Sequence, residues 1–167
     1  MSIVMGLDLS LVGTGVVVLS DLTTPDNPAI LEQVLIESSP KEENTPRLIG
    51  ISTKVMKVII KYKPHLVVME GAAFGVQKTS SIFTLGELAG LVKANMYTMS
   101  QPFMIVTPSA LKKWVTGKGN AKKDLMLLKV YKRFGVEFSD DNLCDAYALA
   151  RYGLPYVNPS LKRRTNG

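Results

Sequence analysis

The chain of 167 residues contains only one cysteine, Cys144, and only one histidine, His65. A single cysteine cannot form a disulfide within the chain, and there is no cluster of histidines and cysteines of the kind that holds zinc. The sequence also has no run of 18 apolar residues, which a membrane-spanning helix needs. Its N-terminus lacks the basic segment and the cleavage site of a secretory signal. These absences lead us to expect a globular protein of a reducing compartment, the cytoplasm.

Positive charge is in excess and is concentrated in one part of the chain. The net charge is +6, but residues 107–134 alone carry eight basic side chains against one acid, Asp124, a net charge of +7 for that segment. A second basic cluster, 162–164, lies in residues 159–167, which we expect to form a tail without fixed structure. Concentrated positive charge is typical of proteins that bind nucleic acid, although a solvated helix face with a basic tail has the same composition.

The hydrophobic pattern predicts one α/β domain, residues 1–158. Three apolar runs in succession indicate an antiparallel meander, and two later short runs are apolar throughout, as in strands covered on both faces. The predicted strands are 3–8, 13–19, 30–37, 65–70 and 103–106, and the predicted helices are 45–63, 79–99, 108–115, 121–134 and 141–153. Residues 25–28 are predicted to form the turn before the third strand, and Thr45 to cap the first helix. We expect a mixed five-stranded sheet, three antiparallel strands followed by two parallel additions, flanked by helices.

Carboxylates lie at the ends of several predicted elements. Asp8 ends the first strand and Glu70 ends the fourth. If these strands are parallel neighbours, their carboxyl ends meet at one edge of the sheet, where sites collect in α/β folds. Asp141 and Asp145 are four residues apart on the last predicted helix and share one face of it. An N-cap at Asp140 or Asp141 explains an acid at the helix start, but it does not explain Asp145 one turn further in.

The converging acids indicate a metal site. Carboxylates in a poorly solvated site repel one another unless a cation lies between them. Oxygen ligands, with no histidine or cysteine nearby, favour Mg²⁺ or Mn²⁺. Taken singly, Asp8 and Glu70 are equally well explained as ordinary strand-end acids. Taken together with Asp145, they predict a divalent metal site.

Four segments, in this order along the chain, resemble motifs of the RuvC-type Holliday junction resolvases. They are GLDLSLVGTGVVVL, LVVMEGAAF, TPSALKKWVTGKGNAKK and DAYALA. The similarity covers residues 3–153, and the compact size is most similar to the phage-encoded branch, whose members would act in the host cytoplasm. The resemblance implies an RNase H-like fold, a homodimer, and metal-dependent cutting of two strands of a four-way DNA junction.

The resemblance also implies the residues of the catalytic site. Asp8, Glu70 and Asp145 match three of the four catalytic acids of the family, which hold two Mg²⁺ ions or Mn²⁺ in their place. The fourth position, three residues before the last aspartate, is an acid or a histidine in the family and is Asn142 here. Asp141, on the same helix face, is one candidate for the fourth ligand, and the amide oxygen of Asn142 is the other.

Basic residues around the glycine-rich loop 116–120 are predicted to contact DNA phosphates. Lys112 and Lys123 match family positions near the scissile phosphate. The full set of predicted contacts is Lys112, Lys113, Lys118, Lys122 and Lys123. Phe74 lies one residue from the position of a family aromatic that stacks at the junction centre, and a plain hydrophobic anchor for its loop explains it equally well.

The sequence therefore predicts a structure-selective endonuclease that acts as a homodimer on four-way junctions and other branched DNA, without a nucleotide cofactor or a membrane partner. The small residues of 79–99 suit packing across a two-fold axis, but also packing within one monomer. A junction-binding protein with a degenerate site is an alternative, which Asn142 favours. A phosphotransferase of the actin-like fold opens with a similar strand and Thr-Gly hairpin, but it needs a second lobe to hold adenosine.

Overall fold

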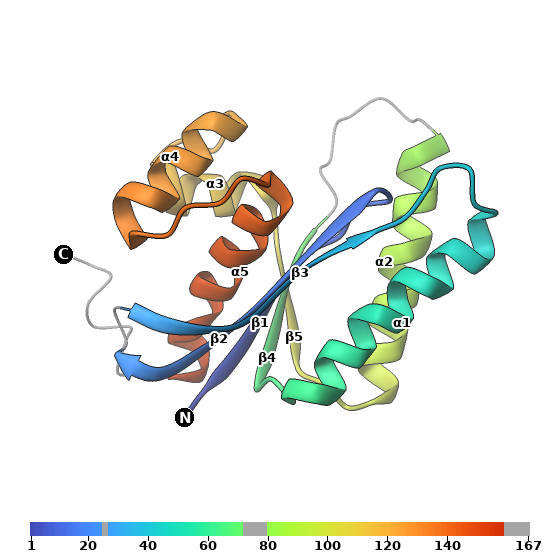
Figure 1. Cartoon of the computed structure of the whole chain (residues 1–167), viewed down its shortest axis with the longest axis horizontal. Helices are drawn as coiled ribbons and strands as arrows, with labels where there is room; N and C mark the ends of the chain where they lie inside the picture. The colour runs from blue at the N-terminus through green and yellow to red at the C-terminus, as the bar shows by residue number, and fades with distance from the viewer. Residues whose placement is uncertain (25–26, 72–79, 159–167) are drawn as a thin grey trace.

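A computed structural model of the chain shows five strands in one sheet with helices on both faces (Figure 1). The structure describes residues 1–24, 27–71 and 80–158. The strands are β1 (Ile3–Asp8), β2 (Gly13–Thr24), β3 (Asn27–Glu37), β4 (Leu66–Glu70) and β5 (Phe103–Val106). The helices are α1 (Asn44–Tyr62), α2 (Ser80–Thr98), α3 (Pro108–Thr116), α4 (Lys123–Phe134) and α5 (Asp141–Val157). Every predicted element is present, in the predicted order.

The sheet is mixed, in the order β3-β2-β1-β4-β5. The first three strands form the predicted antiparallel meander, and β4 and β5 are added parallel to β1. Leu7 of β1 is in register with Met69 of β4, so the next residue of each strand, Asp8 or Glu70, ends at the same edge of the sheet. The parallel pairing on which the predicted site depends is therefore confirmed.

Several boundaries differ from the prediction: β2 continues to Thr24 rather than residue 19, and α5 to Val157 rather than residue 153. Two further differences concern the predicted turn and helix cap. Thr24 pairs with Asn27, so Asn27 and Pro28 belong to β3 rather than to a turn over 25–28. Proline is tolerated there because β3 is an edge strand. The cap of α1 is Glu43, without a side-chain hydrogen bond, and not Thr45, since the helix begins at Asn44.

Each face of the sheet has its own hydrophobic core. On one face α5, with α3 and α4 outside it, packs against residues such as Val4, Val17 and Val68; on the other face α1 and α2 pack against Met5 and Val67 (Figure 1). Burial on both faces explains why β1 is apolar throughout until it reaches its terminal aspartate. Within the described ranges, no helix combines the length and the apolar character needed to span a bilayer.

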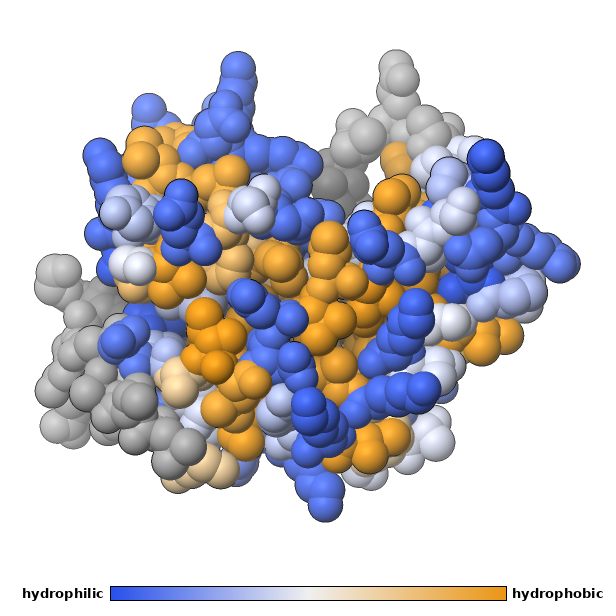
Figure 2. Space-filling model, in the orientation of Figure 1, coloured by the Kyte–Doolittle hydropathy of each residue, from blue (hydrophilic) through white to orange (hydrophobic). Residues whose placement is uncertain are grey.

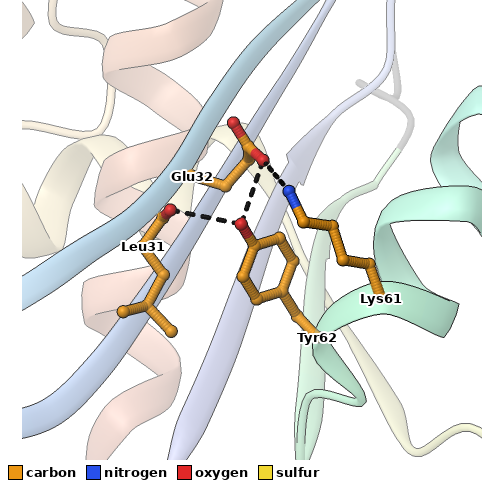
Figure 3. A network of polar contacts seen from close by, with 4 residues as sticks. All are labelled: Leu31, Glu32, Lys61 and Tyr62. Atoms are coloured by element: carbon orange, nitrogen blue, oxygen red, sulfur yellow. Dashed lines mark hydrogen bonds and ion pairs between the residues drawn. The ribbon is translucent and has the colours of Figure 1, made fainter.

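A polar cluster ties the edge strand β3 to α1 (Figure 3). The Glu32 carboxylate accepts hydrogen bonds from Lys61 Nζ at 2.7 Å and from the Tyr62 hydroxyl at 3.0 Å, and the same hydroxyl lies 3.3 Å from the Leu31 carbonyl oxygen. The Lys61 side chain is exposed, so its ion pair contributes little on its own. The cluster links β3 to the last turn of α1.

Helix α5 lies directly against the backbones of β1 and β2. A Cβ atom added at Gly6 would lie 1.8 Å from the carbonyl oxygen of Ala146, and one added at Gly15 would lie 2.2 Å from the carbonyl oxygen of Asn142. Glycine is needed at these two positions because a side chain has no room, which holds the first turns of α5 beside the end of β1. This contact places Asp145 next to the strand that ends in Asp8.

We expect Gly6→Ala to lower the free energy of unfolding by about 3 kcal/mol, the upper end of the usual cost of overpacking, because its methyl group meets backbone rather than a flexible side chain. Gly50→Ala, in α1 with nothing within 4 Å of the added atom, is the matched control and should leave stability unchanged or raise it by about 0.5–1 kcal/mol. Denaturant unfolding measures both. An unfolding midpoint of Gly6→Ala equal to that of the wild type would contradict the close contact.

Candidate active site

Four carboxylates line one cavity of about 240 Å³ at the carboxyl ends of β1 and β4. Asp8 comes from β1, Glu70 from β4, and Asp141 and Asp145 from α5, which begins at the same upper edge of the sheet in Figure 1. All four residues were predicted to belong to the site, and the structure brings them together. Asn142, the other candidate for the fourth ligand, also lines the cavity.

Hydrogen bonds within the β1–β2 turn fix the chain just after Asp8. The Ser10 N–H donates to Thr14 Oγ1 at 3.1 Å, and the Thr14 hydroxyl donates back to the Ser10 carbonyl oxygen at 2.8 Å. The Gly13 N–H donates to Ser10 Oγ at 3.3 Å. A serine and a threonine four residues apart therefore close the turn that follows the first acid of the site.

A buried arginine, which the sequence analysis missed, anchors the same turn. The Arg47 guanidinium, at the start of α1, donates to the Leu11 carbonyl oxygen and, at 2.9 Å, to Ser38 Oγ. The Ser38 hydroxyl donates to the Leu11 carbonyl oxygen at 2.6 Å. No local signal identifies this role, because the partner lies 36 residues earlier in the chain.

The cap of α5 leaves the later acids of that helix to the cavity. Asp140 is the N-cap, one of the two predicted candidates, and its carboxylate accepts a hydrogen bond from the Leu143 N–H at 3.0 Å. Because Asp140 satisfies the helix end, Asp141 is not needed there and lines the cavity with Asp145.

The cavity raises the pKa values of two strand-end acids well above their ordinary range. Burial, and after it the charges of Glu70, Asp145 and Asp141, raises the pKa of Asp8 to about 8. Burial and the charge of Asp145 raise the pKa of Glu70 to about 7, against the opposing effect of Lys112. These groups are costly to ionise together in the absence of added positive charge.

The same forces act on the acid of α5. Burial and the charge of Asp141 raise the pKa of Asp145 to about 6, while Lys112 and Lys123 act in the opposite direction. Lys123 forms an ion pair with the Asp141 carboxylate. The hydrogen bond from Lys123 to Asp141 within this ion pair, together with the charges of Asp141, Asp145 and Asp8, raises the pKa of Lys123 above its usual value. Two lysines thus offset part of the negative charge in the cavity.

The chemistry of the donor set fits a hard divalent cation. Asp8, Glu70, Asp141 and Asp145 offer carboxylate oxygens and Asn142 an amide oxygen, and a cation between them would relieve the repulsion that raises their pKa values. In the part of the chain that the structure describes, no three acidic, histidine or cysteine side chains form a ready-made metal site.

The predicted DNA-contact residues divide into two groups. Lys112 and Lys123 line the cavity, whereas Lys113, Lys118 and Lys122 are exposed outside it on α3, on the loop that follows, and at the start of α4. Figure 2 shows hydrophilic side chains, mixed with hydrophobic ones, at the upper left of the molecule, in the region of α3 and α4.

Two further residues from the sequence analysis, Phe74 and Cys144, have different outcomes. The prediction for Phe74 concerns a residue outside the described ranges. Cys144 was interpreted as a small buried hydrophobe; it is buried, and it also contributes to the cavity wall with Met126 and Leu127.

Comparison with known proteins gives one consistent family. The family model described as crossover junction endodeoxyribonuclease RuvC matches residues 4–151. RuvC of Endomicrobium trichonymphae is 30% identical over 168 residues, which cover 98% of this chain and 86% of that protein. RuvC of Brachyspira hyodysenteriae is 31% identical over 121 residues, 72% of this chain and 75% of the relative.

Solved structures confirm the predicted fold. Thermus thermophilus RuvC in complex with a Holliday junction substrate has a TM-score of 0.80 at 22% identity, over 96% of this chain and 98% of that one. The yeast mitochondrial Holliday junction resolvase has a TM-score of 0.68 at 16% identity, over 99% and 82% of the two chains. The fold is the RNase H-like α/β fold of these proteins. The family match over residues 4–151, with 30% identity along nearly the whole length, shows that this chain belongs to the RuvC family of crossover junction endodeoxyribonucleases.

Proposed function

We propose that this protein is a metal-dependent endonuclease that resolves four-way DNA junctions, and cuts other branched DNA, by paired strand cuts. The observation that carries the proposal is the convergence of Asp8, Glu70, Asp141 and Asp145 with two lysines in one cavity of a RuvC family member. The relative of known structure with a TM-score of 0.80 is in complex with a Holliday junction substrate.

The proposed reaction is hydrolysis of a phosphodiester bond. A water oxygen forms a bond to phosphorus, the bond from phosphorus to the 3′ oxygen breaks, and a proton goes to that oxygen, which leaves a 5′ phosphate and a 3′ hydroxyl. When bound, two Mg²⁺ ions, or Mn²⁺ in their place, activate the water and stabilise the leaving oxygen. Asp8, Glu70 and Asp145 would hold them, with Asp141 or Asn142 as the fourth ligand.

Other residues of the cavity and its rim bind and orient the DNA strand. Lys112 and Lys123 neutralise the phosphate that enters the cavity, since each carries its charge beside the carboxylates. Lys113, Lys118 and Lys122 contact phosphates further along the backbone, as the exposed basic surface of α3 and α4 favours. The predicted stacking of Phe74 at the junction centre remains a prediction.

Paired cutting needs two sites, so we infer a homodimer formed through α2. This helix exposes 65% of Phe83 and 82% of Tyr97. A side chain added at Gly86 or Gly90 of the same helix would meet nothing within 4 Å, which leaves space for a partner helix to approach. An origin in the phage-encoded branch remains a prediction, since the two relatives compared above are bacterial. Action in the cytoplasm also remains a prediction.

We expect Asp8→Asn to lower the rate of junction cleavage by about 10³-fold or more, because it removes a charged ligand of the proposed metal site, while junction affinity stays within about threefold. Cleavage and gel-shift assays on the same synthetic four-way junction measure the two quantities. Asp124→Asn, which neutralises an exposed acid on α4 outside the cavity, is the matched control and should cut normally. Full cutting by Asp8→Asn would overturn the proposed function.

In the metal-free protein, Asp8→Asn should also raise thermal stability at high pH. The pKa of Asp8 rises from 3.8 to about 8 in the folded state. Between these two pH values the folded protein still holds a proton that the unfolded chain has released. Stability is therefore lost as the pH rises from about 4 to about 8, and the asparagine escapes this loss. We expect the variant to melt about 5 °C above the wild type at pH 8.5, with a smaller gap at pH 5. Equal melting temperatures at both pH values would contradict the burial of a charged Asp8.

The dimer is tested by Gly90→Arg. The arginine has space in the monomer but would lie between two copies of α2, so we expect the wild type to sediment as a dimer and the variant as a monomer. Gly50→Arg, at an equally open position of α1, is the control and should leave the dimer intact. Analytical ultracentrifugation distinguishes these outcomes, and a Gly90→Arg protein that remains dimeric would exclude α2 as the interface.

A further inference from the structure

The Lys123–Asp141 ion pair joins the starts of two helices across the cavity. Lys123 is the first residue of α4 and Asp141 the first residue of α5, and the lysine ammonium pairs with the Asp141 carboxylate. The lysine side chain is 75% exposed and the aspartate side chain 32% exposed. The ammonium therefore lies on the solvent side of the pair, where a DNA phosphate would arrive, and the carboxylate lies on the cavity side.

This pair involves the acid that precedes Asn142, the position at which the chain departs from the family pattern. The expected fourth acidic position is Asn142, which has no charge, so Asp141 is the remaining acid of α5 that can add a fourth carboxylate to those of Asp8, Glu70 and Asp145. In the structure its carboxylate pairs with the ammonium group of Lys123.

The charge of Lys123 also substitutes in part for a metal ion. Besides Asp141, it acts favourably on the ionised forms of Asp8 and Asp145. An ammonium that already pairs with one carboxylate and attracts two others competes with a cation for the same ligands.

We propose that Lys123 is a positioning residue that pairs with the Asp141 carboxylate, and so keeps it from binding a metal ion, until a DNA phosphate takes over the ammonium group. The released Asp141 carboxylate then completes the ligand set formed by Asp8, Glu70 and Asp145. A bound phosphate draws Lys123 away from Asp141 and frees the carboxylate for a metal ion. A bound metal ion draws Asp141 away from Lys123 and frees the ammonium group for a phosphate. Each binding event therefore favours the other. This inference rests on the proposed function, since it assumes that the cavity holds a divalent ion and receives a phosphate.

Mn²⁺ affinity in the absence of DNA tests the proposal, measured by isothermal titration on the full chain. Lys123→Met keeps the apolar stem but frees Asp141, and we expect it to bind Mn²⁺ about fivefold more tightly than the wild type. Lys123→Arg keeps the ion pair and should bind as the wild type does. Lys132→Met removes an exposed charge of α4 outside the cavity, so it should change the affinity by less than twofold.

A double-mutant cycle separates the ion pair from a general effect of charge. In an Asp141→Asn background, Lys123→Met should no longer alter Mn²⁺ affinity, because the carboxylate that it releases is absent. An equal gain in both backgrounds, or no gain from Lys123→Met in the wild-type background, would overturn the positioning role.

The wild type distinguishes this failure from failure of the proposed function. A wild-type protein that binds Mn²⁺ and cuts junctions, while Lys123→Met binds Mn²⁺ with unchanged affinity, contradicts only the role of Lys123. A wild-type protein that neither binds Mn²⁺ nor cuts junctions contradicts the proposed function itself.

Discussion

The candidate site depends on the direct contact of α5 with the backbones of β1 and β2. At Gly6 and Gly15 the helix carbonyl groups approach so closely that no side chain fits between helix and sheet. This approach brings the acids of α5 within range of the acids that end β1 and β4. A larger separation would leave the same residues as unrelated acids at the ends of separate elements.

Much of the fold follows from signals that are local in the sequence. Apolar runs predict the five strands, and the switch to helical spacing predicts the helices. Strands that are apolar throughout predict burial on both faces, which is why Asp8 and Glu70 stand out at their ends. Asp145 could be predicted because an N-cap explains Asp140 but no capping role explains an acid one turn further along.

Contacts between distant parts of the chain escaped the sequence analysis. The bond from Arg47 to the turn after Asp8, and the pairing of Lys123 with Asp141, depend on how helices sit on the sheet. Local patterns carry no information about such packing. The cap of α1 was predicted at Thr45 because a threonine followed by proline is a typical cap signal, but the helix begins one residue earlier, at Asn44.

Ionisation of the buried acids is unfavourable in the metal-free protein, as their raised pKa values show. A metal-dependent nuclease site explains why these acids lie together. The most direct measurement is incubation of the protein with a synthetic four-way DNA junction, in parallel with Mg²⁺, with Mn²⁺ and with a chelator. We expect symmetrically paired cuts that leave 5′ phosphates, and these cuts should appear only with a divalent metal. Binding of the junction without cutting in either metal would contradict the account and would indicate a junction-binding protein with a degenerate site.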